Sequence, residues 1–179
     1  MSNPLTAITD ELEKQQLWEK ERILKRNEFL KHGIGLDTNL YFVVGGTLRI
    51  FVIDQEEELT IRFGYKGNLI TALDSYLTEQ PSDLYIQALK ETHLKVISKK
   101  SYVNFMNNRS DIQALWYQLM EQFVYQQMER ERDILISSPT ERYRRVLQRS
   151  PHLFQEIPHK YIASYLRMTP ETLSRIKKS

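Results

Sequence analysis

The chain has 179 residues, of which 41% are apolar and 27% charged, and it contains no cysteine. The composition is that of a folded protein, and the missing cysteine excludes disulfides, thiolate metal sites, iron–sulfur clusters and cysteine nucleophiles. No segment approaches the ~18 consecutive apolar residues of a membrane span. Charged residues at 10–14 occupy the place of a signal peptide's apolar stretch. We therefore expect a cytoplasmic protein without a membrane partner.

The net charge of +2 is unevenly distributed along the chain. Residues 139–179 hold nine Lys and Arg against three acids, a net charge of +6, and the other 138 residues carry −4. A basic end on an acidic body indicates a nucleic-acid partner for that end. A solvated, charged helical tail explains the same charge equally well.

The N-terminal part of the chain changes pattern near residue 26. Residues 1–20 predict one or two surface helices, and 26–99 predict a β-rich region. Within it, runs of β-branched and aromatic residues, partly with period two, predict strands at 41–46, 48–53, 59–63, 84–89 and 94–97. Several short strands at this spacing predict a β-sandwich or small barrel.

A long amphipathic helix of about 25 residues is predicted after Ser110, since no Gly or Pro occurs from there to Ser138. Its apolar stripe needs a cover, and we expect it both to lie on its own β domain and to pair with a second copy. The residues expected to make this dimer helix are Ile112, Leu115, Trp116, Leu119 and Phe123.

The helix is expected to end at a hinge around 137–140. Ser138 or Thr140 can cap a new helix, and Pro139 suits its first turn. Residues 158–178 then predict two short helices joined by a tight turn, with Thr169 as N-cap and Pro170 in the first helical position. Such a pair is a helix-turn-helix.

The first helix of this pair should bury Ile162, Ala163 and Leu166, and the second should bury Leu173 and Ile176. The N-terminal part of a second helix of this kind enters the DNA major groove, where Arg reads guanine and Glu accepts from cytosine. An ordinary helical hairpin with a charged outer face is the alternative. The candidate DNA-binding residues are Thr169, Pro170, Glu171, Thr172, Ser174, Arg175 and Lys178.

The order of a β-rich domain, a long helix, a hinge and a helix-turn-helix resembles the Crp/Fnr family of bacterial transcription regulators over nearly the whole chain. Residues 161–176 read YIASYLRMTPETLSRI, which is similar to a signature of the Bacteroidetes branch. The resemblance implies an α+β fold with a jelly-roll, cyclic-nucleotide-binding-like domain at 1–109, a dimerisation helix at 110–136 and a DNA-binding domain at 137–179.

The resemblance also places a ligand pocket in the β domain, and there the sequence departs from the family. Thr71 and Ala72 stand where members that bind cyclic AMP carry a Gly-Glu pair, and Ser82 and Asp83 stand where they carry the Arg that clamps the phosphate. Asp83 would repel a phosphate, so we expect no cyclic AMP and no resident cofactor, with an unidentified effector left open. The candidate pocket residues are Gly67, Asn68, Leu69, Ile70, Thr71, Ala72, Ser82, Asp83 and Leu84.

The helix-turn-helix departs from the family pattern as well. Arg167 stands at a turn position that is commonly Gly, so it should adopt a positive φ. Pro170 replaces an Arg, while Glu171, Thr172 and Arg175 match the family pattern. The sequence ends at Ser179, without the wing that follows in many relatives.

Catalytic patterns are missing from the sequence. The four His residues show no metal-ligand spacing, and there is no nucleophile elbow, Walker loop or dinucleotide fingerprint. We expect a homodimeric, sequence-specific transcription regulator and not an enzyme, with DNA, its own second copy and RNA polymerase as candidate partners. The alternative is a small-molecule-binding or protein-interaction module with a degenerate DNA-binding region.

Overall fold

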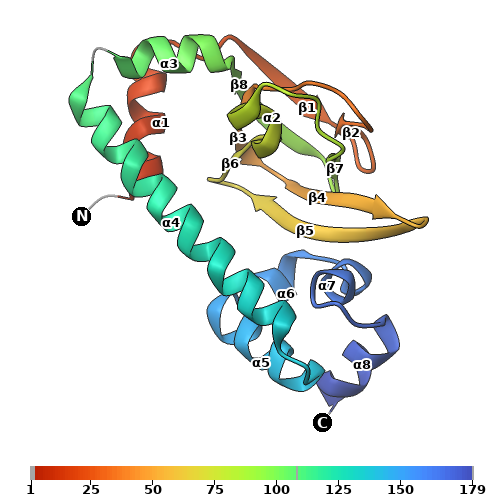
Figure 1. The fold of residues 1–179 in the computed structure, drawn as a ribbon. Coiled ribbons are helices and arrows are strands. Elements are labelled where there is room, and N and C mark those ends of the chain that lie inside the picture. The colour runs from red at the N-terminus through yellow and green to blue at the C-terminus, as the bar shows by residue number, and fades with distance from the viewer. Residues whose placement is uncertain (1–2, 108, 179) are drawn as a thin grey trace. The chain divides into compact units, whose positions relative to one another are not determined.

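The computed structural model describes residues 3–107 and 109–178 (Figure 1). The chain forms two compact units. The first unit comprises the chain up to Phe51 together with Phe63–Gln122, and the second comprises Val52–Arg62 and the chain from Phe123 onward. A segment of one strand hairpin therefore belongs to the C-terminal unit.

Two four-stranded sheets make up the β part of the fold, with the strand orders β1-β8-β3-β6 and β2-β7-β4-β5. The paired strands are antiparallel, with Val43 opposite Leu94 and Ile50 opposite Ile86. The strands are β1 Lys20–Leu24, β2 Phe29–Lys31, β3 Leu40–Gly45, β4 Thr47–Asp54, β5 Glu57–Tyr65, β6 Leu69–Ile70, β7 Tyr85–Ala88 and β8 Thr92–Ile97.

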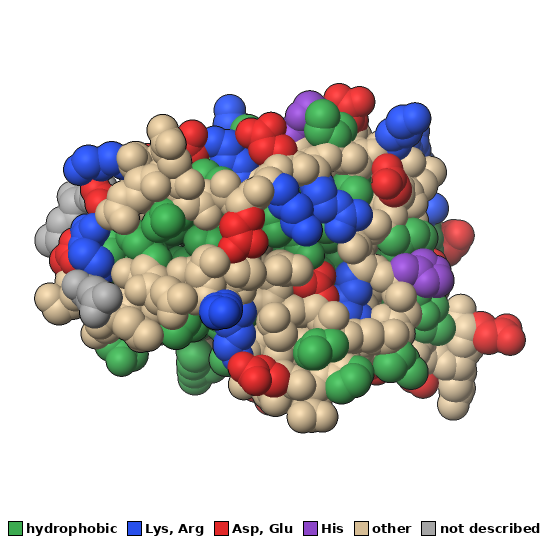
Figure 2. All heavy atoms as spheres, turned by 90° about the horizontal axis from the view of Figure 1, so that it is seen from above, with side chains coloured by type: hydrophobic (Ala, Val, Ile, Leu, Met, Phe, Trp, Pro, Cys, Tyr) green, Lys and Arg blue, Asp and Glu red, His purple; other side chains and the backbone are tan. Residues whose placement is uncertain are grey.

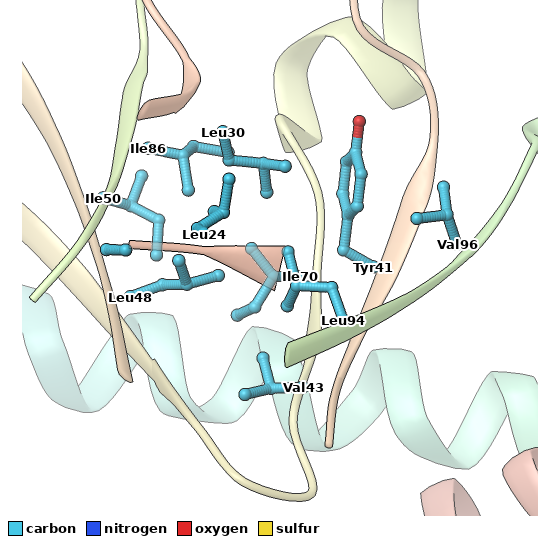
Figure 3. Close-up of a cluster of buried hydrophobic side chains, with 11 residues drawn as sticks. Leu24, Leu30, Tyr41, Val43, Leu48, Ile50, Ile70, Ile86, Leu94 and Val96 are labelled. Carbon is cyan, nitrogen blue, oxygen red and sulfur yellow. The ribbon is translucent and has the colours of Figure 1, made fainter. Parts of the chain in front are cut away.

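The core of the first unit lies between the two sheets. Strand β8 buries Leu94 and Val96, and β7 buries Ile86 and Ala88, because successive side chains of a strand point to opposite faces. Figure 3 shows side chains of both sheets in this cluster, among them Leu94 and Val96 from β8 and Ile86 from β7. The expected alternation and the expected β-sandwich are therefore confirmed.

A second buried cluster fastens helices to the sandwich. The helices are α1 Pro4–Lys14, α2 Leu73–Thr78, α3 Lys99–Asn107 and α4 Ser110–Leu135. The cluster consists of Ile8, Leu12, Leu40, Tyr76, Ile97, Tyr102, Phe105 and Ile112. The helix predicted after Ser110 is thus present, and its N-terminal half is anchored on the β domain by its own apolar side chains.

The residues predicted to form the dimer helix lie mainly in this cluster. Ile112 is buried in it, and Leu115, Trp116 and Leu119 pack against it. The ring of Trp116 lies 5.1 Å from that of Tyr102. These side chains face their own domain because the cluster gives them apolar partners within the protomer. The large apolar side chains that α4 leaves exposed are Tyr117, Val124, Tyr125, Met128, Ile134 and Leu135.

The N-terminal segment differs from its prediction in one element. Helix α1 is present and buries Leu5, Ile8 and Leu12, which lie three and four residues apart. Residues 20–24, however, form strand β1, which pairs with β8 along the sandwich edge. Its charged residues mask the strand pattern, since only Leu24 is fully buried. Pairing with a neighbouring strand, which a local pattern does not contain, decides the conformation.

The turn between β3 and β4 leads to a testable prediction. Gly46 has a φ of +98°, and a Cβ there would overlap the Glu91 carbonyl oxygen and Thr92. We expect Gly46→Ala to lower the free energy of unfolding by roughly 3 kcal/mol, measured by urea denaturation. Gly45→Ala is the matched control, since among the described residues no atom beyond its own chain neighbours would lie within 4 Å of a Cβ there. An equal loss from both substitutions would contradict this explanation.

The second unit contains four further helices and the hairpin segment Val52–Arg62. Ser138 caps α5 by accepting a 3.3 Å hydrogen bond from the Glu141 backbone N–H, and Pro139 occupies the first helical turn, as the sequence indicates. The helices are α5 Pro139–Arg149, α6 Leu153–Glu156, α7 His159–Tyr165 and α8 Pro170–Lys178. The predicted α+β fold, with a β-sandwich, a long helix and a C-terminal helix-turn-helix, is confirmed.

Candidate nucleic-acid interface

Helices α7 and α8 form the predicted helix-turn-helix. Arg167 has a φ of +54° in the turn, the left-handed conformation that its position requires. The Met168 backbone N–H donates to the Ala163 carbonyl at 3.0 Å and closes this turn. Thr169 caps α8 by accepting a 3.2 Å hydrogen bond from the Thr172 N–H. The turn and the start of the second helix are thus fixed by local hydrogen bonds.

The inner face of the pair is apolar and closely packed. Ile162, Ala163, Leu166 and Leu173 are all 0% exposed. Because Ala163 has only a methyl group, a second helix can cross close to it. The orientation of α8 on α7 is therefore set by buried side chains, and the opposite face of α8 is left to solvent.

The predicted DNA-binding residues lie on that outer face. All of them are exposed except Thr172, which is half-buried beside its capping partner. Five of them line one open hollow along α8: Pro170, Glu171, Ser174, Arg175 and Lys178. The structure thus brings together a carboxylate, a hydroxyl and two cations on one helix surface, which can donate to and accept from base edges.

The charges on this surface are suited to polar recognition. Hydrogen bonds from its own backbone N–H and from the Thr169 side chain lower the pKa of the Glu171 carboxyl. Glu171 is therefore an ionised acceptor at neutral pH, next to the positive end of the helix dipole. Within residues 3–107 and 109–178, the Arg175 guanidinium has no ion-pair partner, so its donors are available to a ligand.

Some of the arginines that make this unit basic form ion pairs within the unit. Arg145 donates at 3.1 Å to Asp133, whose side chain is 0% exposed, and Arg149 contacts the same carboxylate. Glu129 accepts from Arg145 at 3.2 Å. These two arginines neutralise acids of α4 and fix α5 on it. The charge count of the sequence does not separate them from arginines that face solvent.

Arg142 is also internal. Its side chain is buried, and its guanidinium donates to the carbonyl oxygens of Ile136 and Leu166 at 2.6 and 2.8 Å. It donates further to those of Ser137 and Arg167 at 3.1 and 3.0 Å. One side chain thereby joins the hinge after α4 to the turn of the helix-turn-helix. The sequence gives no local signal for this role.

The hairpin segment of the second unit contacts the first helix of the pair. The Ser164 hydroxyl accepts from the Thr60 backbone N–H at 3.0 Å and donates to the Glu58 carbonyl at 2.9 Å. Arg130 of α4 lies 3.9 Å from the centre of the Tyr165 ring. Helix α7 is therefore held by the hairpin segment and by α4 as well as by α8, and Ser164 forms part of this support.

The predicted pocket residues lie in the first unit, on separate segments. Ile70 of β6 and Ala72 are buried, while Gly67 lines a hollow that Trp18 and residues of α1 also line. Ser82 is buried and Asp83 is exposed. The backbone of Ser82 exchanges two hydrogen bonds with that of Gly35, at 3.0 and 3.1 Å. The segment that contains Ser82 is thus tied to the loop after β2.

The described residues offer neither a metal site nor a membrane-spanning helix. Among the described residues, no three His, Asp or Glu side chains form a group that could hold a metal ion. No described helix combines the length and the apolar character needed to cross a membrane. The face seen in Figure 2 carries both acidic and basic side chains. It therefore has no continuous positive surface that would attract a polyanion.

The elements together define a β-sandwich followed by a long helix and a helix-turn-helix. No family model and no curated protein matches the sequence. Solved structures are similar. FixK2 from Bradyrhizobium japonicum is 17% identical with a TM-score of 0.71, over 89% of this chain and 82% of that one. CLP, the c-di-GMP-responsive regulator of Xanthomonas campestris, is 14% identical with a TM-score of 0.70, over 95% and 90%.

A CooA mutant from Carboxydothermus hydrogenoformans is similar to the same degree. It is 14% identical with a TM-score of 0.70, over 89% of this chain and 74% of that one. These neighbours are regulators of the Crp/Fnr family. The resemblance drawn from the sequence is therefore confirmed for the fold.

Proposed function

We propose that the protein is a sequence-specific DNA-binding transcription regulator. The observation that carries the proposal is the outer face of α8, where Glu171, Ser174, Arg175 and Lys178 line one open surface on a capped, rigidly seated helix. In a helix-turn-helix this surface enters the major groove. The β-sandwich at 1–109 is the sensor-like domain, and residues 137–179 are the DNA-reading part.

The regulator acts as a homodimer through the long helix at 110–136. Support comes from the apolar side chains that α4 leaves exposed, among them Val124 at 57% and Met128 at 51%. A monomeric protein gains nothing from an apolar line on a long helix, and a second copy can cover it. Two recognition helices then meet major grooves ~34 Å apart on an inverted repeat.

The β domain does not take cyclic AMP by the usual chemistry, since the exposed Asp83 stands where a phosphate would need a cation. The c-di-GMP response named for CLP and the other effectors of similar structures leave the effector of this chain open. RNA polymerase is a candidate partner of the DNA-bound form.

DNA binding is tested by fluorescence anisotropy with fragments from upstream of the protein's own gene. We expect Arg175→Ala to weaken binding to the preferred fragment roughly 10- to 100-fold, because a bidentate guanine contact discriminates by about 1–3 kcal/mol. Binding to unrelated DNA should change little. The affinity should also fall steeply as salt is raised, because phosphate contacts release counterions.

The control removes one positive charge elsewhere. Lys66 lies at an exposed turn of the first unit. Lys66→Ala should leave the affinities for the preferred fragment and for unrelated DNA unchanged. Weak binding that is equal for all fragments and is unchanged in Arg175→Ala would instead favour the alternative of a protein-interaction module.

A further inference from the structure

The side chain of Lys31 is an unusual feature of the β domain. Lys31 lies on β2 and is only 7% exposed. Its ammonium group donates to the carbonyl oxygens of Gly33 and Ser82 at 2.7 Å, and to that of Leu84 at 2.9 Å. An ammonium has three N–H donors. All three are therefore satisfied by backbone carbonyls and none by a carboxylate.

The surroundings of this ammonium are electronegative. Burial lowers the pKa of Lys31, and the charges of Asp74, Asp37 and Asp83 oppose that shift. The three carboxylates and the three carbonyl oxygens together favour a cation at this position. An anion placed here would meet repulsion from both sets of oxygens. The site is thus built for a positive charge.

Lys31 also joins two segments far apart in the sequence. The backbones of Gly35 and Ser82 exchange two hydrogen bonds, and the Leu84 N–H donates to the Ser82 hydroxyl at 3.0 Å. The ammonium spans the same two segments from the inside. Without it, the carbonyls of Gly33 and Leu84 would lose the ammonium donor, and the Ser82 carbonyl would keep only the Gly35 N–H. Each lost hydrogen bond in this poorly solvated place costs free energy.

We propose that Lys31 is an internal ligand of the β domain. It occupies a carbonyl site that accepts a primary ammonium and holds the loop after β2 against residues 82–84. The two segments are therefore held together at this site without an external effector. The site takes no phosphate-bearing ligand. This inference concerns the β domain alone and does not rest on the proposed DNA binding.

The test uses the full chain and thermal unfolding followed by circular dichroism. Lys31→Met keeps the length of the side chain but removes the donors, and it should lower Tm by roughly 5 °C or more. Lys95→Met is the matched control. Lys95 is partly buried and pairs with Glu13 on the sheet surface at 2.5 Å, and its loss should shift Tm much less.

Chemical rescue identifies the ligand class. Lys31→Ala retains Cβ, and n-propylammonium supplies the missing three carbons and the ammonium. We expect this amine to raise the Tm of Lys31→Ala by several degrees, with no effect on wild type. Tetramethylammonium at the same ionic strength should not do so, because it has no N–H donor. Cyclic AMP and cyclic di-GMP should leave the Tm of wild type unchanged.

Three results would overturn the proposal. One is a Tm for Lys31→Met no lower than that of Lys95→Met. Another is a failure of n-propylammonium to stabilise Lys31→Ala. The third is a rise in the Tm of wild type with either cyclic nucleotide that Lys31→Met abolishes. If Lys31→Ala is recovered unfolded, its refolding yield is measured with and without n-propylammonium. A higher yield with the amine supports the proposal, and an equal yield overturns it.

Discussion

Replacing Arg142 with methionine is expected to abolish specific DNA binding although Arg142 does not lie on the outer face of α8. The substitution removes hydrogen bonds to four carbonyl oxygens, two at the hinge and two in the helix turn. Carbonyls left without a donor in a buried place cost about 1–3 kcal/mol each. Allowing for partial solvation, the free energy of unfolding of the C-terminal unit should fall by about 3–5 kcal/mol.

The measurement separates loss of positioning from loss of charge. Hydrogen exchange reports the opening of the turn at 166–169, and anisotropy reports the affinity for DNA. Arg144→Met is the matched control, since Arg144 is an exposed neighbour on the same helix and its loss removes the same charge. It should weaken binding slightly and leave the protection of the turn unchanged. Wild-type protection and affinity in Arg142→Met would contradict the assigned role.

Arg142→Lys refines the same prediction. The planar guanidinium offers five donors in a fixed fork, whereas an ammonium is a point with three. A lysine cannot reach carbonyls of both Ile136 and Arg167 with the geometry that Arg142 uses. We therefore expect an intermediate loss of affinity. A full rescue by lysine would show that charge, and not geometry, matters at this position.

Arg142 also illustrates where prediction from the sequence ends. The start of α8 could be predicted because Thr169 and Pro170 act on their own backbone, and the positive φ of Arg167 followed from its place in a turn. The role of Arg142 depends on carbonyls 24 and 25 residues away. Such contacts are set by packing, which has no fixed spacing along the chain.

The β domain shows the same division. Strands with period-two patterns were predicted, because a strand buried on one face alternates apolar and polar residues along the sequence. Strand β1 was missed, because its pairing partner β8 lies some 70 residues away along the chain. The pocket segment could be assigned only by resemblance. The contact between Lys31 and the carbonyls of Ser82 and Leu84 required the three-dimensional structure.

The long helix was predicted from the sequence. The pattern did not distinguish the apolar residues that pack on the first unit from those that are left exposed. Leu115, Trp116 and Leu119 pack on the first unit. The apolar side chains left exposed include Tyr117, Val124, Met128 and Leu135, which recur at intervals of seven, four and seven. These four residues, which we call the exposed stripe, follow the heptad spacing of a two-stranded coiled coil. Because both sets of apolar residues lie on one continuous helix, the sequence pattern alone does not say which set faces the domain.

Placing acids in the exposed stripe is expected to separate the two copies. In the double variant Val124→Asp/Met128→Asp, four carboxylates per dimer would have to be buried at the centre of the stripe, and buried unpaired charges are strongly unfavourable. Sedimentation equilibrium should therefore find a monomer. Circular dichroism should still find a folded protein, because the anchor of α4 on its own domain is untouched.

The same variant should lose most of its affinity for an inverted repeat. When one copy is bound, the second binds its half-site at a high effective concentration, which is worth roughly 10²- to 10⁴-fold. The double variant should lose this factor and bind a single half-site as wild-type protein does. Leu77→Asp is the control, since Leu77 is 64% exposed and lies on α2 of the first unit, not on α4.

The two DNA measurements discriminate between the parts of the proposal. A monomer that keeps half-site binding would show that α8 reads DNA and that α4 supplies only the second copy. A variant that stays dimeric would place the interface elsewhere and leave the function of the exposed stripe unexplained. Glu121 and Glu131 fall on the same line of the helix and interrupt its apolar character. The centre at Val124 and Met128 is therefore where the substitution should act most strongly.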